Sequence, residues 1–425
     1  MPLPCQRSGR YLSTSVASCM LPRHMFAEED RHLAPAPSHV EAKRRQGILF
    51  VSIAVAAVSF ALTAQIGLND NFLANPPSLG GLGIDGFQKG LIEAARETCG
   101  ITALLIFAIL AGMVERTIGF FAIAVFAIGL GSYFWVYHYV WVIVLSMVWS
   151  QGLHVWMPLP NSMMLSLAEP GRTGHRLGQL QAVGSAASGT ALLACWVMCA
   201  AHVPIRPIYI MAGLIALVGA FACLAIPRDI KAPGPRFVFR RKYNLYYMLC
   251  FLEGSRKQIF LAFAGFLLVK KYGTPLKDMI LLMAVVQVIN WLASPAIGRI
   301  IDRIGERPVL MFYSGCMVVF FIGYAFIPSR LVLWGLFIVD NVLFSLGMAL
   351  TTYVRKIAPA SEHTQTLSMG VAMNHVAAVL VPLAGAFLWR YTGFRWAFLA
   401  GSAIAAVGVL VASRLPQHQS KPVRG

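Results

Sequence analysis

Long apolar runs alternate with short polar segments along most of this 425-residue chain. A helix of roughly 20 apolar residues, rising about 1.5 Å per residue, is long enough to cross the hydrocarbon core of a bilayer. Each run therefore predicts a transmembrane helix. The twelve runs lie at about residues 47–69, 87–113, 117–135, 139–166, 177–200, 207–226, 243–269, 276–297, 308–327, 331–354, 367–389 and 395–414.

The longest hydrophilic interruption falls at residues 227–242, in the middle of the chain. It separates six expected helices from six more, and both ends of the chain are polar. The first tail lacks the apolar run of a signal peptide, and Met20 and Met25 are alternative starts. The predicted organisation is a tail at 1–46, a six-helix bundle at 47–227, a basic linker at 228–242, a second six-helix bundle at 243–415 and a tail at 416–425.

Composition excludes the soluble domains that the length alone would allow. Hydrophobic residues make up 58% of the chain and charged residues 12%, whereas soluble domains average about 25% charged residues. The predicted fold class is an all-α polytopic membrane protein. The pattern Gly81-x-Gly83-x-x-Gly86 has no strand before it and no acidic partner in a βαβ unit, so it does not indicate a dinucleotide site. We expect no enzymatic activity, no cofactor and no metal site.

Basic residues are distributed unevenly between the two sides of the predicted membrane. Most Lys and Arg residues near the runs fall on the side of the N-terminal tail and the central linker, which predicts that both termini are cytoplasmic. A bacterial inner membrane is the expected location. The net charge of +18 is then a signal of topology and needs no nucleic-acid partner. The smaller opposite set is Lys89, Arg206, Lys270, Lys271, Lys277, Arg330, Arg390 and Arg395.

The seventh run carries Glu253, Arg256 and Lys257 near its middle. Each charge at the centre of a membrane helix costs roughly 2.5–3.5 kcal/mol, and the apolar residues of this run return only roughly 4–7 kcal/mol in all. The run therefore makes sense as a helix that lines a polar cavity. In a purely structural alternative, Glu253 pairs with Arg256 or with Lys257 on its own helix, which leaves one cation over.

The loop after the eighth run reads GRIIDRIGERP at residues 298–308. Its two glycines permit a tight turn at the membrane surface, Asp302 can sit at a helix N-terminus, and the arginines can reach carbonyls or lipid headgroups. The loop resembles the signature cytoplasmic loop of the major facilitator superfamily, G-x-x-x-D-R-x-G-x-R/K, which acts there as a latch between helices. The resemblance implies a cytoplasmic gate formed by Gly298, Asp302, Arg303, Gly305 and Arg307.

A more degenerate copy of this loop follows the second run, at residues 111–119, with Glu115 in place of the aspartate. The resemblance covers about residues 45–415. It implies two six-helix bundles related by a pseudo-twofold axis along the membrane normal, with a midplane cavity lined by helices one, four, seven and ten. The charged residues of the seventh run would then face the substrate.

Further polar residues at membrane depth complete the candidate site. On the second helix, Arg96 can reach Glu93 at i−3, and Glu97 shares a face with Glu93. A lone Asp340 on the tenth helix has no neighbour in sequence to neutralise it, so it is the preferred proton carrier. The expected substrate-binding residues are Arg256, Lys257, Glu253, Gln151, His154 and Asn341, and the expected proton-coupling residues are Asp340, Glu97 and Glu93.

Several polar residues have a plainer interpretation. His154 can carry a proton or can be a neutral, hydrogen-bonded histidine. The run Asn69-Asp70-Asn71 reads as an outer cap on the first helix, and Asn374 and His375 read as packing or gating residues. The cysteines in the apolar runs read as reduced packing residues.

The sequence thus predicts a secondary active transporter that works by alternating access. Two adjacent cations on the seventh helix favour an anionic organic solute, with protons as the coupling ion. The expected partners are the lipid bilayer and the small-molecule substrate, and the expected oligomeric state is a monomer. Two alternatives stay open: a proton-driven exporter of drugs or of amphipathic or cationic compounds, and a non-transporting sensor or assembly factor.

Overall fold

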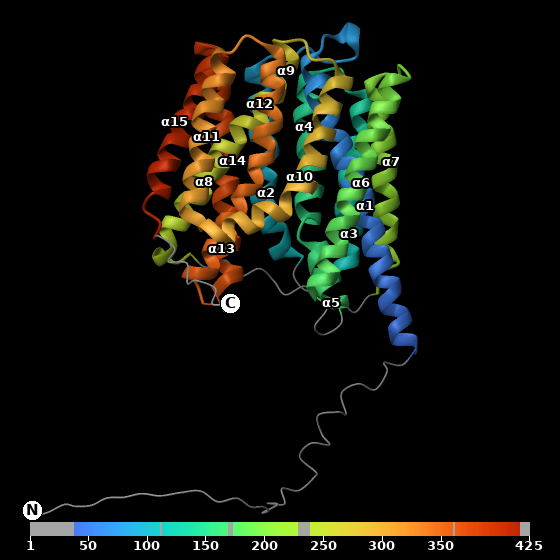
Figure 1. Ribbon diagram of the computed structural model, residues 1–425. Coiled ribbons are helices and arrows are strands. Elements are labelled where there is room, and N and C mark those ends of the chain that lie inside the picture. The colour runs from blue at the N-terminus through green and yellow to red at the C-terminus, as the bar shows by residue number, and fades with distance from the viewer. Residues whose placement is uncertain (1–37, 111–112, 169–172, 228–238, 360–361, 417–425) are drawn as a thin grey trace, which may run out of the picture. The chain divides into compact units, whose positions relative to one another are not determined.

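Each expected run forms one helix or several consecutive helices in the computed structural model (Figure 1). The structure describes residues 38–110, 113–168, 173–227, 239–359 and 362–416. The first half of the chain forms α1 (Ser38–Ala74), α2 (Gly86–Ile109), α3 (Glu115–Gly131), α4 (Tyr139–Trp156), α5 (Leu159–Leu167), α6 (Thr173–Ala200) and α7 (Ile205–Leu224). The second half forms α8 (Asn244–Ile259), α9 (Gly265–Lys270), α10 (Leu276–Ile304), α11 (Glu306–Phe326), α12 (Arg330–Leu343), α13 (Met348–Ile357), α14 (His363–Thr392) and α15 (Phe394–Ala412).

Three of the expected spans consist of consecutive helices. The break between α4 and α5 falls at Met157 and Pro158, and Pro160 lies in the first turn of α5; proline removes a helical hydrogen bond and crowds the preceding turn. Between α8 and α9 lies one turn of π-helix, η5 (Phe260–Ala264). Between α12 and α13 lies the 3₁₀ turn η6 (Phe344–Gly347). A π-bulge changes the direction in which the following side chains point, and such bulges are frequent at functional sites.

Two expected boundaries were wrong because polar residues extend helices past the apolar runs. α1 begins at Ser38, inside the expected tail, since Glu, Lys and Arg are good helix formers. α10 continues to Ile304 through most of the expected loop. Residues 228–238 of the expected linker and the expected tail from 417 onward lie outside the described residues.

Nine helices in the described parts of the chain are long and apolar enough to cross a membrane. Three of the expected spans fall outside this set: α2, the α8–η5–α9 segment and α10. α2 and the α8–η5–α9 segment each carry several charged residues close together. Of these segments, α2 carries most of the charged side chains of the site described below. The structure is therefore that of an all-α polytopic membrane protein.

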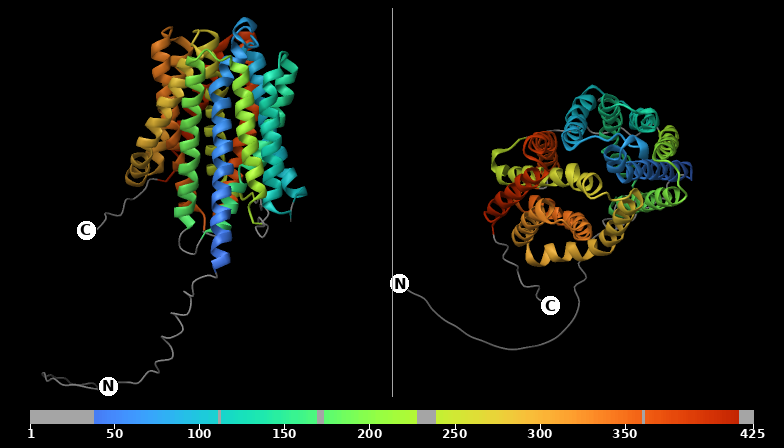
Figure 2. Two further views of the ribbon diagram at one scale, coloured as in Figure 1. Left: turned by 90° about the vertical axis from the view of Figure 1, so that its right-hand side faces the viewer. Right: turned by 90° about the horizontal axis from the view of Figure 1, so that it is seen from above.

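The helical body begins at Arg45, within α1. Within this body, α3 packs against α4 and α7 in the first half, and α8 packs against α14 and α15 in the second. The halves meet where α2 packs against α14 and where α6 packs against α10. Seen from above, helices of the first half, coloured blue to green, lie beside those of the second, coloured yellow to red (Figure 2).

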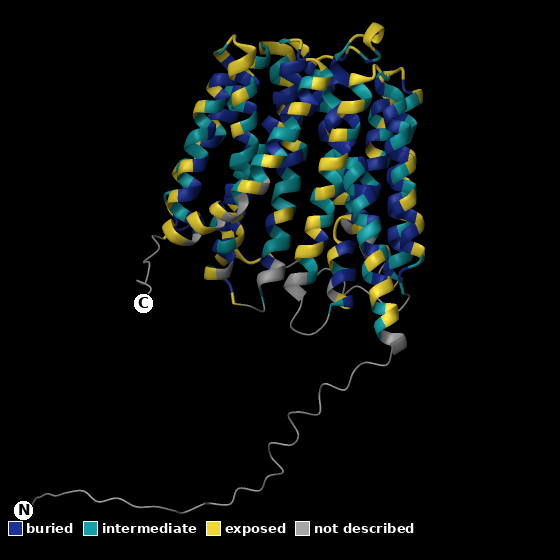
Figure 3. Cartoon of the chain, turned by 45° about the vertical axis from the view of Figure 1, so that its right-hand side comes forward, coloured by how far each residue is buried: buried dark blue, intermediate teal, exposed yellow. Residues whose placement is uncertain are grey.

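Exposed residues, coloured yellow, lie along the outer faces of the helices (Figure 3), and many of them are large and apolar. Leu410 is 66% exposed, Val319 64% and Phe221 63%. A water-soluble protein rarely exposes such a continuous apolar surface, whereas the hydrocarbon of a bilayer solvates it. Small residues and aromatic rings fill the space between the helices.

Hydrogen bonds tie the two halves together at one end of the body. The Asn71 side chain donates to the carbonyl of Thr274 at 3.2 Å, and Lys270 donates to the carbonyl of Gly83 at 3.0 Å. This end holds α9 and the loop before α2, and it lies opposite the end at which α15 finishes (Figure 1).

At the other end, the segment that enters α8 is tied to the segment that enters α14. Tyr243 donates to Glu362 at 2.6 Å, and the Lys242 ammonium lies 2.9 Å from the same carboxylate. The hydrogen bonds from Tyr243 and Lys242 lower the pKa of Glu362. These contacts anchor the last residues of the basic linker to the second half.

Candidate functional site

A cavity of about 330 Å³ lies between the two halves. Residues of α1, α2 and α6 form its wall on one side, and residues of η5, α9, α10 and α12 form the other. Its volume is at the lower end of the range for small-molecule sites. The cavity is lined by Thr63, Gln65, Ile66, Asn69, Asp70, Lys89, Glu93, Arg96, Ser188, Leu192, Phe260, Leu261, Gly265, Met283, Val286, Gln287, Phe337 and Asn341.

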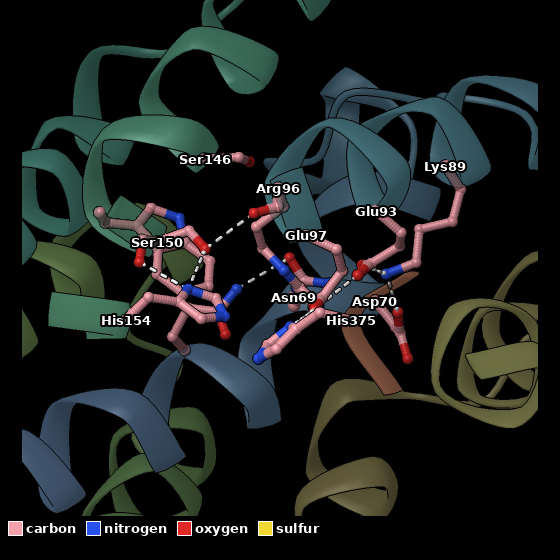
Figure 4. Close-up of polar contacts among 12 residues, drawn as sticks. Asn69, Asp70, Lys89, Glu93, Arg96, Glu97, Ser146, Ser150, His154 and His375 are labelled. Atoms are coloured by element: carbon pink, nitrogen blue, oxygen red, sulfur yellow. Dashed lines mark hydrogen bonds and ion pairs between the residues drawn. The ribbon is translucent and has the colours of Figure 1, made fainter. Parts of the chain in front are cut away.

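Four charged side chains from α1 and α2 form a chain of ion pairs along the cavity wall (Figure 4). The Lys89 ammonium lies 3.0 Å from Asp70 Oδ1 and 2.7 Å from Glu93 Oε1. Arg96 contacts the other oxygen of Glu93. The Lys89 and Glu93 side chains are 1% and 2% exposed. Because buried charges are costly unless they are paired, each member depends on its neighbours.

The chain of ion pairs continues from α2 towards α4 and α14. Arg96 Nη2 lies 3.1 Å from Glu97 Oε1, and Glu97 Oε2 lies 3.7 Å from Nδ1 of His375. The His375 ring packs edge to face on the His154 ring with centroids 5.3 Å apart. Nδ1 of His154 lies 2.8 Å from the carbonyl oxygen of Ser150. The network therefore reaches from α2 and α4 of the first half to α14 of the second.

Local sequence explains how α2 presents these side chains. Asp85 caps the helix: its carboxylate accepts from the amide of Gln88, and the Gln88 side chain accepts from the amide of Asp85. From this start, Lys89, Glu93 and Arg96 recur at intervals of four and three residues, so they share one face of the helix.

Glycines allow the close contacts around the network. A Cβ atom at Gly265 would lie 2.1 Å from Oδ2 of Asp70, and one at Gly100 would lie 2.5 Å from Nδ1 of His375. Both distances are far below van der Waals contact. The absence of a side chain at these two positions therefore makes room for Asp70 beside α9 and for His375 beside α2.

The structure places two of the expected substrate residues, Glu253 and Arg256, away from this cavity. They line a separate void of about 20 Å³ among helices of the second half, which has room for about one water molecule. Arg256 is 2% exposed, lies 3.5 Å from Glu253, and stacks over the ring of Tyr313 at 4.0 Å. Both terminal nitrogens of its guanidinium lack a hydrogen-bond partner among the described residues.

The other expected substrate residues are dispersed. Asn341 lines the cavity between the halves, and Lys257 is half-buried on α8. Gln151 accepts from the Thr102 hydroxyl at 2.5 Å and borders an apolar hollow of about 260 Å³ among α2, α3 and α4. His154 joins the network through the contact of its ring with the ring of His375. The structure thus does not gather these residues at one point.

The expected proton carriers fall into two places. Glu93 and Glu97 belong to the network on α2. Asp340 is fully buried on α12, and neither of its carboxylate oxygens has a hydrogen-bond partner within the described part of the chain. The charge of Arg256 and the phenols of Tyr313 and Tyr324 are its electrostatic neighbours.

The expected gate lies where α10 meets α11. Gly305 has φ +84°, which favours glycine, and it forms the tight turn between the two helices. Asp302 belongs to the last turn of α10, and Glu306 is the acid at the start of α11. The expectation of a helix N-terminus at Asp302 was wrong, because α10 continues past it. Arg303 is exposed and Arg307 half-buried, and the side-chain surroundings of Gly298 and Asp302 lie outside the described residues.

Sequence reasoning missed three residues of the network: Asp70, Lys89 and His375, which was taken for a packing or gating residue. Asp70 was assigned to an outer cap, but α1 continues to Ala74 and the carboxylate pairs with Lys89. Lys89 was counted among the outer cations, yet it is buried. The spacing of Lys89 and Glu93, at i and i+4 on one helix, is the sequence signal that could have identified the ion pair between these two residues.

The family model of the Major Facilitator Superfamily matches residues 47–352 and 246–425. The chain belongs to the Major Facilitator Superfamily. The two matched ranges overlap and together extend from the start of the first apolar run to the end of the chain. The resemblance inferred from the loop at residues 298–308 is thus confirmed.

Solved structures of superfamily members have the same fold. The nucleoside transporter NupG is similar with a TM-score of 0.70 and 14% identity, over 86% of this chain and 98% of that chain. The D-xylose-proton symporter is similar with a TM-score of 0.67 and 14% identity, over 88% and 98% of the two chains. At these identities the likeness shows the fold.

One curated relative is similar over part of the sequence. Tetracycline resistance protein, class C, of Escherichia coli is 27% identical over 146 residues, which are 34% of this chain and 36% of that protein. The match spans about a third of the length of this relative.

Proposed function

We propose that this protein is a proton-coupled secondary transporter that binds a small, polar, anionic organic solute in the cavity between its halves. The observation that carries the proposal is the charged wall of that cavity, with Asp70, Lys89, Glu93 and Arg96 between two packed halves. A cavity between the halves of this fold opens to one side or the other as the halves rock. Charges at membrane depth mark the path of a solute or of protons.

The lining supports the choice of substrate. Lys89 has three donors and two contacts, to Asp70 and Glu93, so one N–H can reach an anionic group. The guanidinium of Arg96 can hold a carboxylate by two parallel hydrogen bonds. Gln287 and Asn341 offer amide groups to hydroxyls, and Phe260 and Phe337 offer apolar surface. Lys89 and Arg96 thus take the place of Arg256 and Lys257 as the cations that face the solute.

Asp340 and Glu93 are the proposed proton-coupling acids. Asp340 is fully buried without a hydrogen bond in the described structure, and a carboxyl group in such surroundings is least costly when it is neutral. Its neighbour Asn341 lines the cavity. Glu93 forms ion pairs with Lys89 and Arg96, and a solute that attracts either cation would weaken its ion pair with Glu93. Solute binding and proton binding would in this way affect each other.

Ligand binding to the purified full-length protein tests the proposed site. Hydroxycarboxylates, dicarboxylates, pentoses and nucleosides are screened by the rise in melting temperature that a ligand produces. Gln287→Ala and Asn341→Ala should each weaken binding of the best ligand by about 10- to 100-fold, since a buried hydrogen-bond partner left unpaired costs about 1–3 kcal/mol. Gln179→Ala, at an exposed position on α6, is the control. Unchanged affinity in both cavity variants would place the solute elsewhere.

A drug exporter is the second candidate function, because the relative that matches part of this chain is named a tetracycline resistance protein. Expression in a tetracycline-sensitive host separates the two proposals. The exporter hypothesis predicts growth at a higher tetracycline concentration. It also predicts that the melting temperature does not change when a carboxylate is added. The anion transporter predicts unchanged sensitivity and a rise in melting temperature with a carboxylate.

We propose in addition that both termini are cytoplasmic, from the distribution of Lys and Arg. Reporter fusions after Pro233 and after Ser420 should both give a cytoplasmic signal. A fusion at Gly80, in the loop before α2, should give the signal of the outer side. A cytoplasmic signal at Gly80 would be incompatible with this orientation.

A further inference from the structure

Glu97, His154 and His375 each offer one ligand atom, and these three atoms lie within 4.8 Å of one another. We propose that they form a binding site for Zn²⁺, or for a transition-metal ion of similar preference, which joins the two halves of the protein. Glu97 belongs to α2 and His154 to α4 in the first half, whereas His375 belongs to α14 in the second (Figure 4). The inference goes beyond the proposed transport function and differs from the sequence analysis, which expects no metal.

The residue types fit the ion. Two imidazoles and one carboxylate are a common set of three protein ligands for Zn²⁺, and water or another group takes the fourth position. Imidazole nitrogen also favours Zn²⁺ over Mg²⁺ or Ca²⁺, which prefer oxygen ligands.

One ring nitrogen of His154 already has the kind of partner that a metal-binding histidine has. Its Nδ1 lies 2.8 Å from the carbonyl oxygen of Ser150, and this contact requires the proton on Nδ1. The other ring nitrogen, Nε2, then carries a lone pair. A histidine that binds a metal usually donates its second nitrogen to a carbonyl or carboxylate in this manner, which fixes the tautomer and the ring.

Glu97 has a comparable arrangement on its two oxygens. Oε1 lies 3.1 Å from Arg96, while Oε2 faces Nδ1 of His375 at 3.7 Å. Arg96 is itself held over the ring of Trp149 at 5.5 Å. The arginine thus positions the carboxylate and leaves the second oxygen directed towards the histidines.

The three donors need only a small adjustment to hold a metal. Tetrahedral Zn²⁺ with bonds of about 2.0–2.2 Å has donors about 3.4 Å apart. Side-chain rotations that move the donors by about 1 Å suffice to bring 4.8 Å down to that distance. Gly100 permits the ring of His375 to lie this close to α2, because it has no Cβ beside that ring.

The surroundings allow an ion to enter and remain. The Glu97 side chain is 12% exposed and the His375 side chain 24% exposed, so the site has contact with solvent. Arg96 opposes a cation, but Glu93 and Glu97 both contact its guanidinium and offset its charge. A metal bound here would bridge α2 and α4 to α14, and it would hold the halves in the arrangement of this structure.

Calorimetric titration of the full-length protein with ZnCl₂ alone tests the site. The protein carries an affinity tag without histidine and is first freed of metal with a chelator. We expect one Zn²⁺ per chain, release of protons on binding and a higher melting temperature. His154→Gln and His375→Gln should each weaken the affinity at least tenfold, because each removes one of three ligands. His202→Gln, Cys195→Ser and Cys199→Ser, which lie outside the site, should leave it unchanged.

Co²⁺ provides a second measurement on the unaltered chain, so that the test does not depend on the folding of a variant. The site predicts the visible absorption of Co²⁺ bound by nitrogen and oxygen, without a thiolate charge-transfer band. A thiolate band, loss of binding only in the cysteine variants, or no saturable binding would overturn the proposal. Since Zn²⁺ and Co²⁺ are the only ligands, these results are independent of whether the protein transports an anion.

Discussion

Asp340→Asn should abolish accumulation of the solute against its gradient while leaving exchange of solute across the membrane intact. In proteoliposomes with a pH gradient, the accumulation ratio of the variant should fall to about one. Counterflow, in which labelled solute enters in exchange for unlabelled solute, should continue at a rate near that of the unaltered protein. This is the largest functional effect that we expect from a single substitution.

The physical reason lies in the surroundings of Asp340. Its carboxylate is fully buried and makes no hydrogen bond within the described structure. Asparagine has nearly the same shape and resembles the protonated acid, so it should fit without loss of packing. It cannot release a proton, however. The two halves can then still rock with solute bound, but each cycle no longer carries a proton.

Arg256, Tyr313 and Tyr324 are the charged and titratable groups that interact electrostatically with Asp340. Asp278→Asn, in the first turn of α10, serves as the control because it removes an acid that is not part of this group. Full accumulation in Asp340→Asn would show that another residue carries the proton. Loss of counterflow as well as accumulation would mean that Asp340 is needed for solute binding or for folding.

Lys89→Met should destabilise the protein more than any other single change in the network. The ammonium pairs with both Asp70 and Glu93, and its side chain is 1% exposed. Removal of one partner of a buried ion pair typically costs about 3–5 kcal/mol, because an uncompensated charge stays behind. Methionine preserves most of the packing volume, so the loss reports the charge. The melting temperature and the amount of protein in the membrane should both fall sharply.

A double variant tests whether the unpaired charge causes the loss of stability in Lys89→Met. Asp70→Asn in combination with Lys89→Met leaves Glu93 paired with Arg96 and removes the stranded acid. The double variant should therefore recover most of the lost stability. Lys277→Met, at an exposed lysine, should change stability by less than about 0.5 kcal/mol. If Lys89→Met were as mild as Lys277→Met, the burial of Lys89 between two acids would be wrong.

The fold was predictable because hydrophobic length is a strong signal. Within a bilayer the backbone polar groups must form hydrogen bonds with one another, so each apolar run forms a helix. The turn at Gly305 has a positive φ, which favours glycine. The break at Pro158 follows from proline chemistry. The helix ends were less predictable, since Glu, Lys and Arg at the start of α1 continue a helix as readily as they end one.

The site was less predictable because it depends on which way helices face. Glu253 and Arg256 precede the π-helical turn and point among helices of the second half, whereas Phe260 and Gly265 in or after that turn line the cavity. A prediction that treats the whole run as one regular α-helix cannot anticipate this change of direction. Pairings between helices, such as Asp70 with Lys89, likewise leave no local trace in the sequence.

Coupled movement of solute and protons is the most direct test of the central claim. Purified protein is reconstituted in proteoliposomes, the carboxylate found in the melting screen is added, and the pH and the solute inside are followed together. The account predicts that protons move in fixed proportion to solute in the unaltered protein, that a pH gradient alone drives accumulation, and that both effects vanish in Asp340→Asn. Solute movement that proceeds at the same rate and extent with and without a pH gradient, and with no accompanying proton flux, would contradict it.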